Sequence, residues 1–207
     1  VNILHDFGLN NPDIDKNATP VLCLGPCEVS VGEMVSAYTA FANHGIRCAP
    51  MFVTRIEDSR GNVIAQFQPL MNEVISEGDS YQMIDMLRAV VNGGTASRLH
   101  SYGLDGDIGG KTGTTNNNSD GWFMGITPML VSGCWVGGED RDIHFDSGSL
   151  GQGATMALPV WAYYMQQIYA GPTLPYDPRA RFEIPNGFDF CASNDSIDTN
   201  GIEEEFQ

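Results

Sequence analysis

One short segment of the chain gathers most of the groups that could do chemistry. Residues 105–119 read DGDIGGKTGTTNNNS and hold one of only two lysines in the 207-residue chain, set among four glycines and three threonines. An ammonium group beside hydroxyls can hold a phosphate or a carboxylate. The segment therefore raises two hypotheses, a loop that cradles a nucleotide phosphate and a strand that binds a carboxylate.

The phosphate hypothesis requires the pattern G-x-x-x-x-G-K-[ST], followed directly by a helix whose N-terminus completes the anion site. Counting back from Gly110 and Lys111, the first glycine would have to stand where the chain has Asp105. The segment also continues into three asparagines and Ser-Asp-Gly, which is typical of a turn. Both requirements fail, so the sequence argues against a phosphate loop.

The same residues fit an extended edge strand over 108–115. Alternation would place Lys111 and Gly113 on one face of that strand. Thr112 and Thr114 would lie on the other. Glycines in a strand suit the close approach of another backbone, and an edge strand can bind a peptide as an added strand. The alternative is a glycine-rich edge strand without a ligand, since K-T-G alone is a weak signal.

The elements upstream of this strand follow from hydrophobic periodicity and turn residues. Ser30 and Glu33 form a capping box ahead of apolar residues at helical spacing, and Gly45 ends that helix. Two strand-like runs joined by Asp-Ser-Arg-Gly then predict a hairpin. The expected bounds are 30–45 for this helix, 51–57 and 62–68 for the hairpin, and about 80–92 for a second helix.

The elements downstream are a second hairpin, a loop and a final helix. Residues 121–127 and 130–138 are strand candidates separated by only Pro-Met, which is the spacing of an antiparallel hairpin. A loop rich in glycine and serine over 147–153 leads into a helix of about 155–169. The apolar stripe of that helix is expected to pack on the sheet.

The two ends of the chain differ in character. The chain opens at Val1 inside an apolar pattern closed by Gly8, which reads as the last turns of a longer helix, so we expect a fragment. Residues 9–29 are polar and contain prolines, which predicts an irregular connection. Five of the acids behind the net charge of −16 lie in the last 13 residues, which predicts a disordered tail. The rest still carries about −11, which argues against nucleic-acid binding.

The residue types that could bind a metal ion are scattered through the sequence. The five cysteines are odd in number and lack the paired C-x-x-C of a zinc site, so free thiols are expected, with a Cys23–Cys27 disulfide as the alternative. Residues 140–146, DRDIHFD, match no EF-hand spacing. We therefore expect no metal site and no cofactor. The cysteines are Cys23, Cys27, Cys48, Cys134 and Cys191.

K-T-G is also the third of three motifs shared by penicillin-binding proteins and serine β-lactamases. Around it, GGKTGTTNNNSDGWFMGITP closely resembles the same region of class A penicillin-binding proteins. The resemblance continues through EVSVGEMVSAYTAFANHGI, VTRIEDSRGNVIAQF, MIDMLRAVVNGGTASRL and GQGATMALPVWAYYM, in the family's order. It implies that residues 1–170 are the C-terminal portion of a transpeptidase domain. Residues 171–207 would be an extension that ends in the acidic tail.

The resemblance also implies a fold. We expect an α/β fold of the α+β type, partial and β-lactamase/D,D-peptidase-like. Strands of an antiparallel sheet would have the C-terminal helix packed on one face, with the helices of 30–45 and 80–92 beyond it.

The family cross-links peptidoglycan: a serine attacks the D-Ala-D-Ala bond of a stem peptide, and an amine of a neighbouring stem takes the acyl group. Carried over by motif, Lys111 would be the catalytic cation near the nucleophile and the substrate carboxylate. The hydroxyls of Thr112 and Thr114 would bind that carboxylate, and the N–H of Thr114 would be one donor of the oxyanion hole. Gly113 would let the substrate backbone lie close.

The chain departs from the family pattern in two motifs. The nucleophile motif S-x-x-K is absent, because Asp13 and Ile108 stand three residues before the only lysines, Lys16 and Lys111. No serine begins an S-x-N motif either. By the family's order both motifs lie N-terminal to Val1, so we expect this chain to be inactive alone.

The resemblance implies partners and a location for the full-length parent. Its partners would be the stem peptide and β-lactams, and it would be anchored at the extracytoplasmic face of the bacterial cytoplasmic membrane. The fragment would contact the missing N-terminal part of its domain or self-associate at the cut edge. Two alternatives remain open: a non-catalytic carboxylate- or peptide-binding scaffold module, and a serine β-lactamase-type hydrolase.

Overall fold

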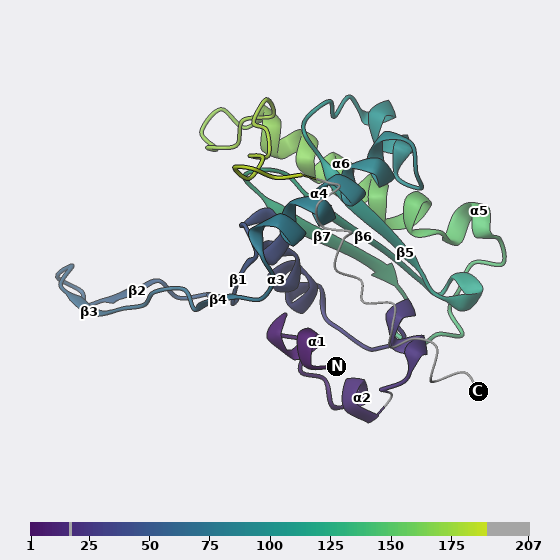
Figure 1. Ribbon diagram of the computed structural model, residues 1–207, viewed down its shortest axis with the longest axis horizontal. Helices are drawn as coiled ribbons and strands as arrows, with labels where there is room; N and C mark the ends of the chain where they lie inside the picture. The colour runs from purple at the N-terminus through teal and green to yellow at the C-terminus, as the bar shows by residue number, and fades with distance from the viewer. Residues whose placement is uncertain (17, 190–207) are drawn as a thin grey trace.

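A three-stranded antiparallel sheet lies at the centre of the computed structural model, which describes residues 1–16 and 18–189 (Figure 1). The predicted hairpin of the last two strands is confirmed, and the expected edge strand is confirmed with one residue fewer at each end. The strands are β5 (Gly109–Thr114), β6 (Asp120–Ile126) and β7 (Val131–Gly137), in the order β5-β6-β7. Within the part of the chain that the structure describes, β5 is therefore an edge of this sheet.

Helices cover both faces of the sheet. The C-terminal helix α6 (Gly153–Ala170) packs on one face, as predicted, and α3 (Val31–Ala42) and α4 (Glu77–Asn92) pack on the other. Trp161 of α6 lies edge-on against Phe123 of β6, with 5.1 Å between ring centroids. A Cβ atom at Gly125 would lie 2.2 Å from the Trp161 ring, so a glycine is needed there for the helix to reach the sheet.

The first predicted helix begins at its predicted cap. Ser30 Oγ accepts a hydrogen bond from the N–H of Glu33 at 3.2 Å, and Glu33 Oε2 accepts one from the N–H of Ser30 at 2.7 Å. The bonds that the Glu33 carboxylate accepts from the N–H and the hydroxyl of Ser30 lower the pKa of this carboxyl. The second helix begins at residue 77 instead of 80, because Ser76 caps it by accepting a hydrogen bond from the N–H of Asp79 at 3.1 Å.

Two segments expected to be irregular contain short helices. Within 9–29 the side chain of Asn11 accepts a hydrogen bond from the N–H of Asp13 at 3.0 Å and starts a helix. Within 147–153 the hydroxyl of Ser147 caps another helix by accepting from the N–H of Ser149. These short helices are α2 (Pro12–Lys16), a 3₁₀ helix (Pro20–Leu24) and α5 (Gly148–Gly151), whereas α1 (Asn2–Asp6) lies in the segment before Gly8 that was expected to be helical.

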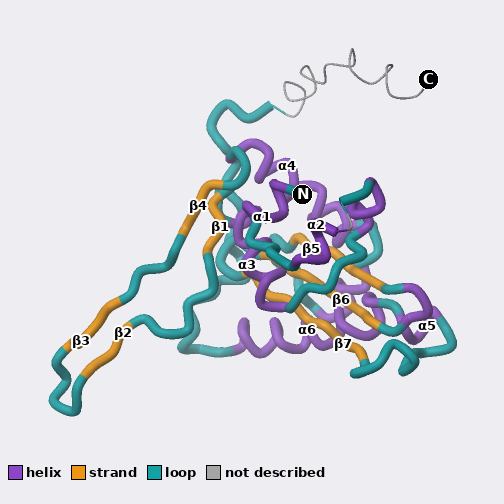
Figure 2. Tube along the Cα trace, turned by 90° about the horizontal axis from the view of Figure 1, so that it is seen from below, coloured by secondary structure: helices purple, strands orange, loops and turns teal. Residues whose placement is uncertain are grey.

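The first predicted hairpin forms the outer part of a long two-stranded arm that projects from the body (Figures 1 and 2). At its tip β2 (Arg55–Glu57) pairs with β3 (Val63–Gln66), so the strands are shorter than expected. At its base β1 (Ile46–Cys48) pairs with β4 (Met71–Glu73), a pairing that sequence reasoning missed. Strands this short carry too few residues for an alternating pattern to be seen.

Residues 171–189 return to the body and contact α4 through Phe182, which is buried against it. The N–H of Phe182 donates to Asp107, just before β5, at 3.0 Å. The predicted acidic tail lies outside the described residues. None of the described helices combines the length and apolar character needed to cross a membrane.

The cysteines that the structure describes are free thiols. Cys23 and Cys27 do not bond to each other, so the alternative of a disulfide between them is wrong. Burial raises the pKa of the Cys27 and Cys134 thiols. Cys191 lies outside the described residues.

Candidate functional site

The K-T-G segment forms the edge strand β5 because its glycines make room for close neighbours. A Cβ atom at Gly110 would lie 2.7 Å from the Phe123 ring, and one at Gly109 would lie 3.0 Å from both Leu87 of α4 and Ile126 of β6. Both glycines are buried. The N-terminal half of β5 is thus fixed between α4 and β6, and its C-terminal half carries the site residues predicted from sequence.

The strand register assigns each predicted site residue to a face. Thr112 lies opposite Phe123 and shares with it the face covered by α6. Thr114 lies on that same face, where its Oγ1 accepts a hydrogen bond from the N–H of Gly153 at the start of α6, at 3.0 Å. Lys111, opposite Met124, belongs to the other face. Lys111 and the two threonines therefore lie on opposite faces of β5, as the alternation in the sequence predicted.

The backbone of β5 presents polar groups at the open edge of the sheet. The N–H of Thr115 donates to the carbonyl of Asp120, so the groups of residue 115 point toward β6. Hydrogen-bonding direction alternates along an antiparallel strand, so the N–H and C=O groups of Thr112 and Thr114 point to the open edge. The backbone N–H of Thr114 is thus directed away from the sheet.

The side chain of Lys111 bends around this edge. Its Nζ donates to the carbonyl oxygen of Thr112 at 2.7 Å, and that carbonyl belongs to the open edge. The lysine is exposed, and it forms no ion pair within the described residues 1–16 and 18–189. Lys111 and the threonines start on opposite faces of β5, and the Lys111 ammonium reaches the open edge between those faces by bonding the Thr112 carbonyl.

A third hydroxyl joins the two predicted ones. Thr95 Oγ1 lies 2.7 Å from Thr112 Oγ1, and both atoms can donate or accept. Thr95 follows the two glycines after α4, and sequence reasoning missed it because only the turn after that helix brings it to β5. Its one local signal is its place in the GGT sequence at the helix end.

Gly153 explains how α6 comes so close to β5 and β6. A Cβ atom at Gly153 would lie 2.2 Å from the carbonyl oxygen of Gly113 and 2.5 Å from that of Trp122. The first residue of α6 therefore rests directly on the backbones of β5 and β6. This contact places the positive end of the α6 dipole beside Thr114, where it favours an anion.

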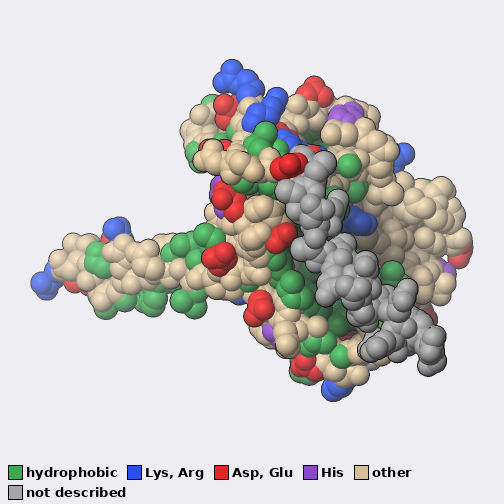
Figure 3. All heavy atoms as spheres, in the orientation of Figure 1, with side chains coloured by type: hydrophobic (Ala, Val, Ile, Leu, Met, Phe, Trp, Pro, Cys, Tyr) green, Lys and Arg blue, Asp and Glu red, His purple; other side chains and the backbone are tan. Residues whose placement is uncertain are grey.

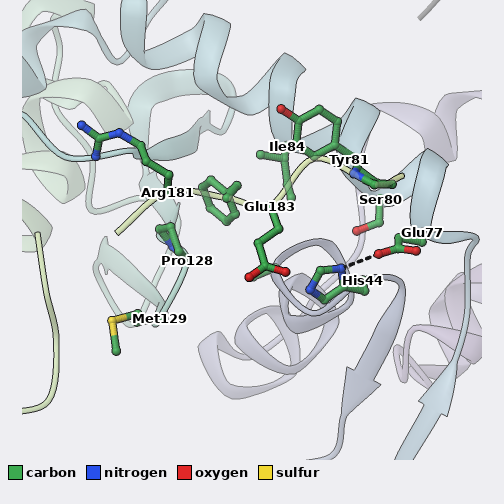
Figure 4. Close-up of a pocket in the computed structure, with 12 residues that line it drawn as sticks. His44, Glu77, Ser80, Tyr81, Ile84, Pro128, Met129, Arg181 and Glu183 are labelled. Carbon is green, nitrogen blue, oxygen red and sulfur yellow. Dashed lines mark hydrogen bonds and ion pairs between the residues drawn. The ribbon is translucent and has the colours of Figure 1, made fainter. Parts of the chain in front are cut away.

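A separate cavity of about 290 Å³ lies between the end of α3, the start of α4, the β6–β7 turn and residues 181–185 (Figure 4). His44 Nδ1 lies 2.8 Å from Glu77 Oε1 at its wall. None of the site residues on β5 lines it. In the described part of the chain, no group of three or more His, Cys, Asp or Glu side chains is arranged to hold a metal ion.

An antiparallel sheet with helices on both faces and a K-T-G strand at its open edge is the architecture of the β-lactamase/D,D-peptidase-like fold. The chain belongs to the penicillin-binding protein transpeptidase family, because residues 6–131 match the family described as "Penicillin binding protein transpeptidase domain". The matched range contains β5 and β6. The family inferred from the motifs is confirmed.

The relatives are similar over most of this chain. Penicillin-binding protein 1A of Aquifex aeolicus is 40% identical over 164 residues, which cover 79% of this chain and 21% of the relative. Penicillin-binding protein 1A of Neisseria lactamica is 37% identical over 171 residues, which cover 80% and 20%. The chain thus spans about a fifth of the length of these relatives.

Solved structures share the fold at lower identity. The crystal structure of penicillin-binding protein 1A from Haemophilus influenzae superposes with a TM-score of 0.72 at 22% identity, over 89% of this chain and 34% of the other. The PonA1 protein of Mycobacterium tuberculosis, solved in complex with penicillin V, gives a TM-score of 0.66 at 22% identity, over 88% and 54%. The partial β-lactamase/D,D-peptidase-like fold expected from sequence is confirmed.

Proposed function

We propose that this chain supplies the K-T-G wall of the active site in a peptidoglycan D,D-transpeptidase that works through a serine acyl-enzyme. The observation that carries the proposal is the open edge of β5. There the N–H of Thr114 points away from the sheet and the Lys111 ammonium bonds the outward carbonyl of Thr112, while the hydroxyls of Thr112 and Thr114 lie on the adjoining face that α6 covers. Membership of the transpeptidase family supports the assignment of this edge to the active site.

The roles follow from what each group can do. The terminal carboxylate of a stem peptide, or of a β-lactam, accepts hydrogen bonds from the hydroxyls of Thr112 and Thr114, next to the positive end of α6. The N–H of Thr114 donates to the oxyanion that forms when the serine oxygen adds to the D-Ala carbonyl. Lys111 supplies positive charge to both groups. Gly113 leaves the substrate backbone room to lie along the edge.

The nucleophile is not among these 207 residues, because no serine has a lysine three positions later. We expect this chain alone to show no covalent labelling by a fluorescent penicillin. In the full-length parent, which we place at the extracytoplasmic face of the bacterial cytoplasmic membrane, the serine belongs to the remainder of the domain. An exposed stripe on α6, formed by Val160, Tyr163 and Tyr164, supports contact with that remainder.

The test is the second-order acylation constant of the full-length protein with a β-lactam. Lys111→Ala is expected to lower it by about two to three decades, the equivalent of a charge-assisted contact of about 2–4 kcal/mol. Lys111→Arg should restore it only in part, since a planar guanidinium replaces a compact ammonium.

Other results would contradict the proposal in different ways. An unchanged acylation constant for Lys111→Ala would show that β5 has only a structural role. Absence of any acylation in the wild-type protein would favour a scaffold module. Rapid turnover of the β-lactam, in place of a lasting acyl-enzyme, would favour a hydrolase.

A further inference from the structure

The arm formed by residues 46–73 exposes many apolar side chains (Figure 3), and at its tip β2 and β3 form a separate two-stranded sheet. Phe52 is 96% exposed and Leu70 is 78% exposed. A two-stranded ribbon is marginally stable in water, and three or more strands are usually needed. The other exposed large apolar residues of the arm are Met51, Val53, Ile56, Val63, Ile64, Phe67 and Met71.

Only one of the two outer edges at the tip is regular. Ile56 pairs with Ala65 and Glu57 pairs with Val63, which leaves Ile64 of β3 as an extra residue in a bulge. A bulge twists an edge and blocks further pairing. The strand β2 has no extra residue, so its outer edge is the one suited to accept another strand.

The backbone groups on that edge can be assigned from the bonds inside the arm. The carbonyl of Thr54 accepts from the N–H of Phe67, and the N–H of Asp58 donates to the carbonyl of Asn62. Residues 54 and 58 therefore direct these groups toward β3. By alternation, the N–H and C=O groups of Arg55 and Glu57 point outward, away from β3.

We propose that two copies of this chain associate through this edge, with β2 pairing antiparallel to β2 of the second copy about a two-fold axis at Ile56. In that register Arg55 of each copy lies opposite Glu57 of the other, so each pair exchanges backbone hydrogen bonds and places opposite charges side by side. The segment is self-complementary, as a two-fold interface requires. Two two-stranded ribbons thus become one four-stranded sheet.

The distribution of charge favours contact at the arm over contact between the bodies. The chain carries −16, whereas residues 46–73 hold three arginines and three acids and are neutral. Ten residues separate Ile46 from Ile56, which is roughly 33 Å of extended strand at about 3.3 Å per residue. Bodies held apart by two arms repel little, because the Debye length is about 8 Å at physiological salt.

The experiment is sedimentation of the 207-residue chain and three variants over a range of concentrations. Arg55→Glu makes the edge wholly acidic, and Glu57→Arg makes it wholly basic. Each variant alone should dimerise at least tenfold more weakly than the wild-type chain. An equimolar mixture of the two should recover a dimer, because each acidic edge then faces a basic one. Arg179→Glu, an equivalent charge reversal on the body, should dimerise like the wild type.

The mixture separates contact between copies from the ion pair that Arg55 and Glu57 form within one copy. Both variants lose the internal pair, so only pairing between copies can explain recovery on mixing. Circular dichroism should show that both variants keep the fold, since both side chains are exposed. A wild-type chain that stays at 22.5 kDa, variants that associate as the wild type does, or a mixture without recovery would each overturn the proposal.

Discussion

The backbone N–H of Gly153 donates a hydrogen bond to the hydroxyl oxygen of Thr114 across 3.0 Å, although 39 positions separate the two residues. This bond joins the first turn of α6 to the K-T-G strand. It uses a lone pair of the hydroxyl oxygen and leaves its proton free to be donated elsewhere. The start of α6 thus orients the hydroxyl that we assign to the substrate carboxylate.

Replacing Gly153 by alanine should strain this junction. The added Cβ would meet the carbonyl oxygens of Gly113 and Trp122 at 2.2 and 2.5 Å, and backbone atoms cannot move aside cheaply. We expect Gly153→Ala to lower the free energy of unfolding by about 1–3 kcal/mol in denaturant titration. Gly148→Ala is the control, because its Cβ would meet only side-chain atoms, the nearest at 3.4 Å. Equal stability of the two variants would contradict the close packing.

Thr95 is predicted to orient Thr112. If Thr95 donates to Thr112 Oγ1, the proton of Thr112 is directed to the substrate carboxylate. Thr95→Val in the full-length protein should therefore lower the β-lactam acylation constant about three- to tenfold, the worth of one hydrogen bond. Thr95→Ser should retain the rate. Ser101→Ala removes an exposed hydroxyl that binds only the backbone of Arg98, and should have no effect. An unchanged acylation constant for Thr95→Val would show that Thr95 does not orient Thr112.

The Arg88–Asp107 pair is predicted to be the electrostatic contact on which stability depends most. Arg88 Nε lies 2.6 Å from Asp107 Oδ1, a second guanidinium nitrogen contacts Oδ2, and the Asp107 side chain is only 7% exposed. The Asp107 hydrogen bond raises the pKa of Arg88. Arg88→Met should cost about 3–5 kcal/mol in the free energy of unfolding, since it leaves a buried carboxylate unpaired.

Two further variants test the origin of that cost. Arg88→Met combined with Asp107→Leu should recover most of the loss, because no uncompensated charge remains. Asp85→Asn removes a partner that lies 4.0 Å from Arg88 with a half-exposed side chain, and should change stability by less than about 0.5 kcal/mol. A loss as large for Asp85→Asn as for Arg88→Met would show that burial of the pair is not the cause.

The phenol of Tyr38 gives a prediction at high pH. Burial raises the pKa of Tyr38 to about 12, above the ordinary value of 10.0, so the folded state holds this proton more tightly than the unfolded state. The protonated phenol therefore contributes fully to the free energy of unfolding below pH 10, and this contribution is lost as the pH rises through about 12. Between pH 10 and about 12 the free energy of unfolding of the wild type should therefore fall relative to that of Tyr38→Phe. A constant difference between the wild type and Tyr38→Phe from pH 9 to 12 would contradict this prediction.

Features that rest on neighbouring residues could be predicted from the sequence. The capping box at Ser30, the β6–β7 hairpin and the extended K-T-G strand all depend on bonds or patterns within a few positions. Short helices such as α2 were missed because one turn capped by a single side chain leaves almost no periodic signal. The base of the arm was missed for a similar reason, since β1 and β4 have three residues each and their closest paired residues, Cys48 and Met71, are 23 positions apart in the sequence.

The sequence by itself determined the family and predicted the site residues, because K-T-G and its flanking residues are carried in one continuous segment. Only the tertiary structure decided how those residues meet. Lys111 reaches the open edge by bending around a strand, Thr95 arrives from the turn after α4, and Gly153 brings the helix dipole to Thr114. These contacts join segments separated along the chain, and their geometry depends on how helices pack on the sheet, which no local pattern specifies.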